Sequence, residues 1–280
     1  MISANPLDHL GVAVHDLAAA RDTYTRLGFN VTPLSVHSGQ NAQGQVQAFG
    51  SGNHCTMFKR GYLELIGIVD PEKPSSVASF LSSRHGGFIT ALGVENAEKA
   101  YERASTFPTA QRPVLLQRYV DHNGQQELVQ FRNVLLGGAF PETRLLMIEH
   151  VTPELIWRPE YLKHPNGVVA LAGAQFLVED SAEAAARYAQ LADGEVLPME
   201  GGGHRLQLDG QELQFFTADS SYPHENAHCP SLCGAIFRVE DIEATANCLE
   251  RNGVRLERVS NRRLVVSPDL ACGFSLTFIS

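Results

Sequence analysis

The stretch Leu7-Asp8-His9-Leu10-Gly11-Val12-Ala13-Val14-His15-Asp16-Leu17 decides the fold. It reads as an apolar strand that ends at Val14, and Asp16 then stands directly before an alanine-rich segment. The side chain of Asp16 can accept hydrogen bonds from the first N–H groups of a helix, which have no partner within the helix itself. The stretch therefore predicts a strand that is followed at once by a capped helix over residues 17–27.

The same pattern occurs three more times along the chain. It is found at Val94-Glu95-Asn96, Val178-Glu179-Asp180 and Val239-Glu240-Asp241, at intervals of about 60 to 85 residues. Each interval has room for one strand, one helix and three further strands, and Asp209-Gly210 is a strong hairpin signal within one of them. We therefore predict an α+β protein of four tandem βαβββ units. The alternative is an unrelated α+β fold whose helix caps are similar by chance.

The four units are expected to form two pairs. A proline-rich stretch that ends in His164-Pro165-Asn166-Gly167 lies between them and is typical of a linker. We predict a first domain over residues 1–151, a linker over 152–167 and a second domain over 168–280. Within the first unit, residues 29–34 are expected to form a strand, and the polar, glycine-rich residues 35–52 a segment that covers the mouth of the domain.

Composition excludes several classes of partner. The chain has 280 residues, 22 basic and 31 acidic side chains and a formal net charge of −9, which offers no electrostatic footprint for nucleic acid or for an anionic membrane. No stretch is apolar for long enough to span a bilayer, and residues 1–8 do not resemble a signal peptide. The five cysteines form no pattern and are expected to be reduced. We expect a cytoplasmic protein whose partners are small molecules.

Several segments of the first half resemble a known family. Residues 7–14, Leu27-Gly28-Phe29, Gly50-Ser51-Gly52-Asn53 and Tyr62-Leu63-Glu64-Leu65 are similar to the opening unit of glyoxalase-like domains in the vicinal-oxygen-chelate superfamily. The resemblance continues to residue 167. It implies that paired βαβββ units form eight-stranded cups, here two glyoxalase-like half-barrel domains. It also implies a divalent metal in a cup, held by side chains from the first and fourth strands of each unit, although other members of the superfamily bind toxic small molecules without catalysis.

His9 stands in the first strand, where family members supply a histidine. On a strand, alternate side chains share a face, so His9 lies on the same face as Gly11 and Ala13, and these small residues would leave room for a metal and a substrate. A neutral imidazole is a natural ligand for zinc, iron, cobalt or nickel. The alternative is a structural histidine that is hydrogen-bonded in the core.

Glu64 is the one carboxylate in an otherwise apolar strand over residues 62–69. A strand covered on both faces would bury it, and a buried carboxylate is costly unless it is paired or bound to a metal. We predict Glu64 as a metal ligand and catalytic residue. The alternative is a glutamate in water on an edge strand.

The third predicted ligand lies in the last strand of the second unit. Aligning Ile148-Glu149-His150 with Leu63-Glu64-Leu65 selects Glu149 as ligand and catalytic residue, whereas a one-residue bulge would turn His150 into the cup instead. A salt bridge from Glu149 to Arg118 or Arg144 is the alternative. His37, Asn53 and His150 are predicted to contact the substrate, although His37 could also be solvated and Asn53 could serve a turn.

The second half lacks the corresponding donors. Where His9 stands in the first unit, the other three units have Ile89, Gly173 and Gly234, and the positions matching Glu64 in the last two units hold Gln214 and Thr277. The sequence therefore predicts one metal-dependent site, in the first half, for a lyase, isomerase or dioxygenase that uses zinc, iron, manganese, nickel or cobalt. The alternative is a non-catalytic protein that binds or sequesters a small molecule. The second half is then open to a role in dimerisation, which would make the protein a homodimer.

Overall fold

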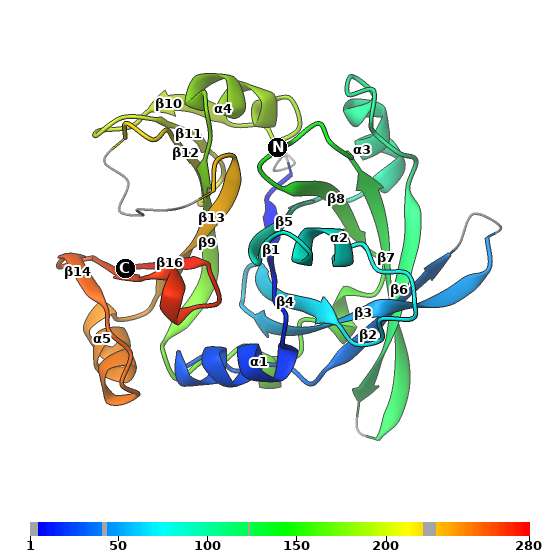
Figure 1. The fold of residues 1–280 in the computed structure, drawn as a ribbon, viewed down its shortest axis with the longest axis horizontal. Coiled ribbons are helices and arrows are strands. Elements are labelled where there is room, and N and C mark those ends of the chain that lie inside the picture. Colours follow the sequence, from blue (N-terminus) through cyan, green and yellow to red (C-terminus); the bar gives the residue numbers. More distant parts are fainter. Residues whose placement is uncertain (1–4, 41–43, 123, 221–227) are drawn as a thin grey trace.

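The computed structural model describes residues 5–40, 44–122, 124–220 and 228–280 (Figure 1). Its first half contains β1 (Leu7–Ala13), α1 (Leu17–Arg26), β2 (Ser35–Gln40), β3 (Val46–Met57), β4 (Tyr62–Ile68), α2 (Ala78–Leu81), β5 (Gly86–Gly93), α3 (Ala97–Ala104), β6 (Val114–His122), β7 (Gln125–Leu135) and β8 (Arg144–His150). Its second half contains β9 (Val168–Leu177), α4 (Ser181–Ala189), β10 (Glu195–Pro198), β11 (His204–Gln207), β12 (Glu212–Phe216), β13 (Ser231–Val239), α5 (Ile242–Arg251), β14 (Glu257–Ser260), β15 (Arg263–Val266) and β16 (Ser275–Ile279). The predicted series of four βαβββ units is confirmed.

All four predicted helix caps are present. Asp16, Asn96, Asp180 and Asp241 each have extended backbone angles. Each aspartate accepts from two backbone N–H groups in the first turn of its helix, and Asn96 accepts from one, that of Lys99. A cap of this kind is typically worth about 1 kcal/mol. Because each cap follows the first strand of its unit, it fixes the point where the chain leaves the sheet.

The first two units form a closed barrel. Its strand order is β1-β4-β3-β2-β6-β7-β8-β5, and the two units meet through the antiparallel pairs β1–β5 and β2–β6. Long strands make closure possible, since β3 spans 12 residues and β7 spans 11. The inner faces of the strands therefore surround an enclosed space.

The last two units repeat this order without closing. Their sheet runs β10-β11-β12-β9-β13-β16-β15-β14, and among the described residues its two edge strands, β10 and β14, do not pair with each other. Both edge strands are only four residues long. Short edge strands of this kind limit edge-to-edge association.

The barrel wall corrects one prediction from the sequence. Residues 29–34 form no strand, whereas the segment expected to cover the mouth supplies β2 and the first part of β3. The alternation of apolar and polar residues was weak here because the inward side chains face a partly polar cavity. Ser51 and Asn53 are examples. A strand whose inner face lines such a cavity lacks the usual apolar pattern.

The segment predicted as a linker packs closely against the barrel. It carries short 3-10 helices at Pro153–Leu155 and Pro159–Tyr161, and the indole N–H of Trp157 donates to the carbonyl of Phe58 over 3.1 Å. The ring of His164 contacts the backbone on both sides, because Nδ1 accepts from Asn30 N–H at 2.9 Å and Nε2 lies 2.8 Å from the carbonyl of Met57. The predicted division into domains stays a prediction.

One apolar core joins the two halves. Phe29 and Phe58 of the first half each lie 5.4 Å from Phe237 of the second, measured between ring centroids. Figure 1 shows the barrel and the open sheet side by side, with β1 and β9 near their junction. Within the described part of the chain, no helix is both long and apolar enough to cross a membrane.

Candidate active site

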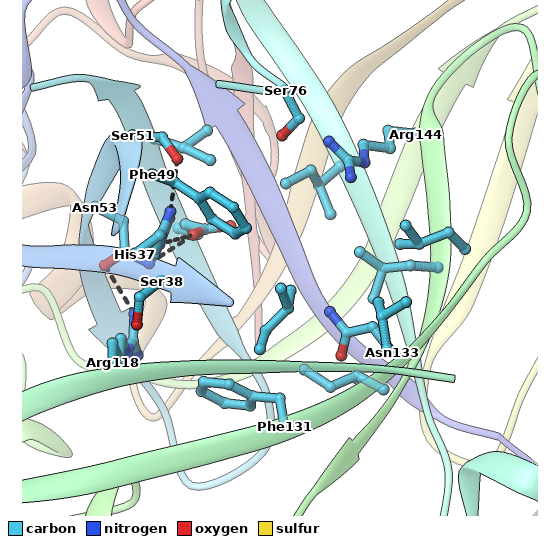
Figure 2. A pocket seen from close by; sticks show the side chains of 18 of the residues that line it. His37, Ser38, Phe49, Ser51, Asn53, Ser76, Arg118, Phe131, Asn133 and Arg144 are labelled. Atoms are coloured by element: carbon cyan, nitrogen blue, oxygen red, sulfur yellow. Dashed lines mark hydrogen bonds and ion pairs between the residues drawn. The ribbon is translucent and has the colours of Figure 1, made fainter. Parts of the chain in front are cut away.

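The barrel of the first half encloses a cavity of about 460 Å³, a volume within the range of small-molecule sites (Figure 2). Its lining is unevenly divided. One side is polar, with His9, His37, Ser51, Asn53, Glu64 and Arg118. The rest is largely apolar and is formed by side chains such as Ile66, Ile89, Leu116, Phe131, Leu135, Leu146 and Ile148. An occupant would therefore meet the charged groups around Glu64 at one end, a mainly apolar surface over most of its body, and the guanidinium of Arg144 elsewhere in the wall.

His9 is buried in the wall of this cavity, on the inward face that the sequence predicted. Its ring stacks on Tyr62 with 4.3 Å between the ring centroids. Its Nδ1 lies 2.8 Å from the carboxylate of Asp8, which accepts the N–H. This bond fixes the tautomer, so the lone pair of the other ring nitrogen, Nε2, is free for chemistry. Nε2 has no hydrogen-bond partner among the described residues.

Asp8 reaches the inside of the barrel through a strand irregularity. The pairing of β1 with β5 shifts register between Leu7 and His9, so the usual alternation of faces is interrupted at Asp8. The same carboxylate also lies 3.0 and 3.1 Å from Nε2 of His150. Burial by itself would raise the pKa of Asp8, but the charges of His150 and His9 and the hydrogen bonds from both rings hold it well below its ordinary range. Asp8 therefore stays ionised between two histidines.

His150 faces inward but lies behind His9 rather than in the cavity lining. Its ring packs against Phe131 and Trp157, with ring centroids 5.4 and 4.8 Å away. The predicted contact between His150 and a substrate is not supported by this position. Its contact with Asp8 makes it a support for the Asp8–His9 pair.

Glu64 is buried, as predicted, with 6% of its surface exposed. The amide N–H of Asn53 donates to it over 2.5 Å, and Nε2 of His37 lies 3.5 Å away. Burial by itself would raise the pKa of Glu64, but hydrogen bonding from His37, the charges of His37 and His9, and the Asn53 amide lower it from 4.5 to about 2. The side chain is a fixed anion at neutral pH.

Asn53 and His37 both line the cavity, as predicted for substrate-binding residues, but each already has protein partners. The amide oxygen of Asn53 accepts from Nη1 of Arg118 over 2.7 Å, so this residue bridges Arg118 and Glu64. Nδ1 of His37 lies 3.0 Å from the hydroxyl of Ser51 (Figure 2). Both residues hold Glu64 in place, and contact with a substrate stays a prediction.

The lowered pKa of Glu64 predicts a pH-dependent contribution to stability. A carboxylate whose pKa is 4.5 unfolded and about 2 folded stabilises the protein fully above pH 4.5 and loses this effect as the pH falls through 2. The free-energy difference between wild type and Glu64→Gln should therefore shrink by about 3 kcal/mol between pH 5.5 and pH 2. Urea unfolding at each pH measures it. The exposed Glu72→Gln variant is the control, and a pH-independent difference for Glu64→Gln would contradict the assignment.

The predicted position of Glu149 in the cup is wrong. Its neighbours Leu146 and Ile148 on β8 line the cavity, and Glu149 points out of the barrel. There its Oε2 accepts from the N–H of Ala97 at the start of α3 over 2.8 Å and lies 3.5 Å from Nη1 of Arg132. A carboxylate in this place balances the unpaired N–H groups and the positive end of the helix.

The error was one of register. Glu64 pairs with Gly11 across β1 and β4, and Leu146 pairs with Ala91 across β5 and β8. Gly11 and Ala91 occupy equivalent positions in their units, three residues before Val14 and Val94, the valines that begin the repeated motif. The counterpart of Glu64 is therefore Leu146, three residues before Glu149.

The donor set does not fit the predicted three-ligand metal site. At the four positions where the resemblance implies ligands, the first unit supplies His9 and Glu64 but the second supplies Ile89 and Leu146. No group of three or more His, Cys, Asp and Glu side chains in the described ranges is arranged to hold a metal ion. Catalytic zinc sites ordinarily use three protein ligands.

Three charged residues of the site were not selected from the sequence. Asp8 is next to His9 in the sequence, and regular alternation of side chains along the strand predicts that it points out of the barrel. Arg118 and Arg144 were considered only as partners for Glu149, yet both line the cavity. The predicted register placed Glu149 on the inner face, which turns Arg144 outward by strand alternation, so the register error for Glu149 also excluded Arg144.

Comparisons with known proteins agree with this architecture. The sequence profile of the family described as "Glyoxalase-like domain" matches residues 7–192. No curated protein matches the chain. A hypothetical protein from Staphylococcus aureus is similar in structure with a TM-score of 0.63 and 10% identity, over 97% of this chain and 98% of that one.

Two further solved structures share the fold. A triple mutant of 4-hydroxymandelate synthase from Streptomyces coelicolor has a TM-score of 0.63 and 12% identity, over 99% of this chain and 93% of that one. A fusion of a xylose isomerase-like TIM barrel with 4-hydroxyphenylpyruvate dioxygenase has a TM-score of 0.60 and 14% identity, over 99% of this chain and 48% of that one. The family profile covers well over half of the sequence. The chain belongs to the glyoxalase-like domain family and has the vicinal-oxygen-chelate fold that its sequence resembled.

Proposed function

We propose that this protein is a small-molecule enzyme of the isomerase or lyase type, in which His9 removes a proton from a carbon next to a substrate carbonyl. The observation that carries the proposal is the buried Asp8–His9 pair, whose free Nε2 faces a cavity of small-molecule size. A histidine held by a carboxylate on one nitrogen and open on the other has the arrangement of a general base.

The surrounding charges favour the protonated form that such a base produces. When Nε2 takes the proton, the electron pair of the C–H bond forms a carbon–carbon double bond and the carbonyl oxygen becomes an enolate. The new imidazolium lies between two anions, Asp8 at its Nδ1 and Glu64 in the cavity wall. If the carbon that loses the proton also bears a hydroxyl, the intermediate is an enediolate: the hydroxyl proton moves to the former carbonyl oxygen, and return of the Nε2 proton to the former carbonyl carbon completes an isomerisation. If the next carbon bears a leaving group, its departure with the electron pair of its bond re-forms the carbonyl and completes a lyase reaction.

Tyr62 is placed to assist at the same end of the cavity. Burial raises the pKa of Tyr62 well above its ordinary value, so its hydroxyl stays protonated. Tyr62 lines the cavity beside His9, and its hydroxyl has no hydrogen-bond partner within the described part of the chain. A neutral O–H donor suits an enolate oxygen, because it stabilises the charge that develops during proton removal.

Metal-dependent chemistry is the second candidate. It is favoured by one observation, since His9 and Glu64 occupy the first and fourth strands of one unit, where the family resemblance implies ligands. Two donors fall short of the usual three. For this reason we assign the proton transfer to protein side chains.

Solvent deuterium exchange separates these proposals. The protein is purified without an affinity tag and dialysed against EDTA. It is then incubated in D₂O with aldehydes, ketones and keto acids that carry an aromatic or an aliphatic group. Proton NMR follows the loss of the signal of the hydrogen on the carbon next to the carbonyl. We expect exchange on at least one compound, unchanged by EDTA. Exchange that requires one added divalent ion would favour the metal enzyme. Binding without any exchange would favour the sequestering protein.

A further inference from the structure

Arg144 stands across the cavity from Glu64, in one row of paired residues. Glu64 pairs with Gly11, Gly11 with Ile89, and Ile89 with Arg144, so the row crosses β4, β1, β5 and β8 in turn. Neighbouring strands lie about 4.8 Å apart, which separates the two ends of the row by about 14 Å along the curved wall. The two opposite charges therefore occupy separate ends of one cavity.

Among the residues that the structure describes, no carboxylate pairs with the guanidinium of Arg144. No hydrogen bond or ion pair is found for this side chain in the residues that the structure describes, and its one close aromatic neighbour is Phe88, with the ring centroid 6.0 Å from Cζ. Burial lowers the pKa of Arg144, and the charge of Glu64 only opposes this effect from a distance. A partly buried arginine without a partner is unusual, because removing its charge from water is costly.

The surroundings of Arg144 suit an anion at the mouth of the cavity. Ser76, which is exposed, lies beside Arg144 in Figure 2, and both also line a neighbouring surface pocket. Ser75 lines the same cavity, and its buried hydroxyl has no hydrogen-bond partner among the described residues. Between this end and His9 the wall is mainly apolar.

We propose that Arg144 binds the carboxylate of a substrate whose apolar body fills the barrel and whose reacting carbonyl end lies at His9. Arg144 is then the residue that selects acids over neutral compounds. The inference rests on the proposed function for the identity of the reacting end and deepens it by naming a substrate class, a carboxylate remote from the reacting carbon.

A carboxylate fits better than a phosphate. One guanidinium matches the single charge and the two oxygens of a carboxylate through paired N–H donors. A phosphate would bring up to two negative charges into a cavity that already holds the ionised Glu64. Inorganic phosphate serves as a probe of this choice in the experiment below.

The test compares acids with their amides. Phenylacetate, 3-phenylpropanoate and 5-phenylpentanoate are titrated calorimetrically against wild-type protein beside the three corresponding amides. At least one acid is expected to bind about 10- to 100-fold more tightly than its amide, as one charge-assisted bidentate contact provides. Arg144→Gln should abolish that preference and leave amide binding unchanged. Arg112→Gln, which removes an exposed arginine of the same charge, should preserve it.

Each other result counts against the proposal. Equal affinity for acids and amides, a preference retained in Arg144→Gln, no binding of any acid, or competition by millimolar phosphate that matches the acids would overturn it. The His9→Ala variant should keep the acid preference while it loses deuterium exchange. If exchange is instead unaffected in His9→Ala but Arg144→Gln loses the preference, the proposed reaction fails and the carboxylate site stands.

Discussion

Replacing His9 by alanine is expected to lower the rate of deuterium exchange about 10²- to 10⁴-fold, the usual contribution of a positioned general base. We expect this loss because Nε2 of His9 is the unpaired ring nitrogen that faces the cavity beside Glu64. The variant leaves a space lined by the ring of Tyr62. Added imidazole should therefore restore part of the rate, and proton NMR under the same conditions measures both effects.

A structural role for His9 would give a different outcome. If the variant lost exchange only because the barrel loosened, imidazole would not restore it and the unfolding midpoint would fall in parallel. The His15→Ala variant removes an exposed histidine between β1 and α1 and should behave as wild type. Full activity in His9→Ala would exclude it as the base.

Replacing Asp8 by asparagine tests whether the Asp8–His9 hydrogen bond sets the tautomer of His9. An asparagine there can present an N–H to Nδ1 of His9 and so favour the wrong tautomer, which makes Asp8 a positioning residue. We therefore expect slower exchange in Asp8→Asn with ligand binding preserved. A rate equal to wild type would mean that the tautomer of His9 is set by another contact.

The second large effect is expected from Gln211, which ties the open sheet to the strand that carries the Asp8–His9 pair. Its side chain is 1% exposed. Its amide oxygen accepts from the N–H of Leu7 at 3.0 Å, and its amide nitrogen donates to the carbonyls of Leu7 and Leu171 at 2.8 and 2.9 Å. The second half thus holds the backbone next to Asp8.

Gln211→Ala should lower the free energy of unfolding by about 3 kcal/mol or more, because each buried polar group left without a partner costs about 1 to 3 kcal/mol. Urea unfolding followed by circular dichroism measures the loss. Gln125→Ala, at an exposed hairpin position, is the matched control and should change the value by less than about 0.5 kcal/mol. A loss below about 1 kcal/mol for Gln211→Ala would mean that water replaces its three bonds.

Local sequence patterns were sufficient to predict the four repeated units and two residues of the candidate site. The caps at Asp16, Asn96, Asp180 and Asp241 act within one turn of the chain, so their chemistry is readable without knowledge of the tertiary fold. The inward face of His9 follows from strand alternation. The burial of Glu64 follows from the apolar residues on both sides of it in β4.

The remaining features depended on how distant strands pair. The register shift that brings Asp8 inside arises between β1 and β5, and the outward position of Glu149 follows from the pairing of β5 with β8. The two ends of the cavity, with Glu64 at one and Arg144 at the other, come together only when the barrel closes. The sequence by itself determined the four units and the His9 and Glu64 positions, because those follow from contacts within a few residues. Only the tertiary structure decided which further charges share the cavity, because strand register sets the neighbours of every inward side chain and a one-residue shift reverses its face.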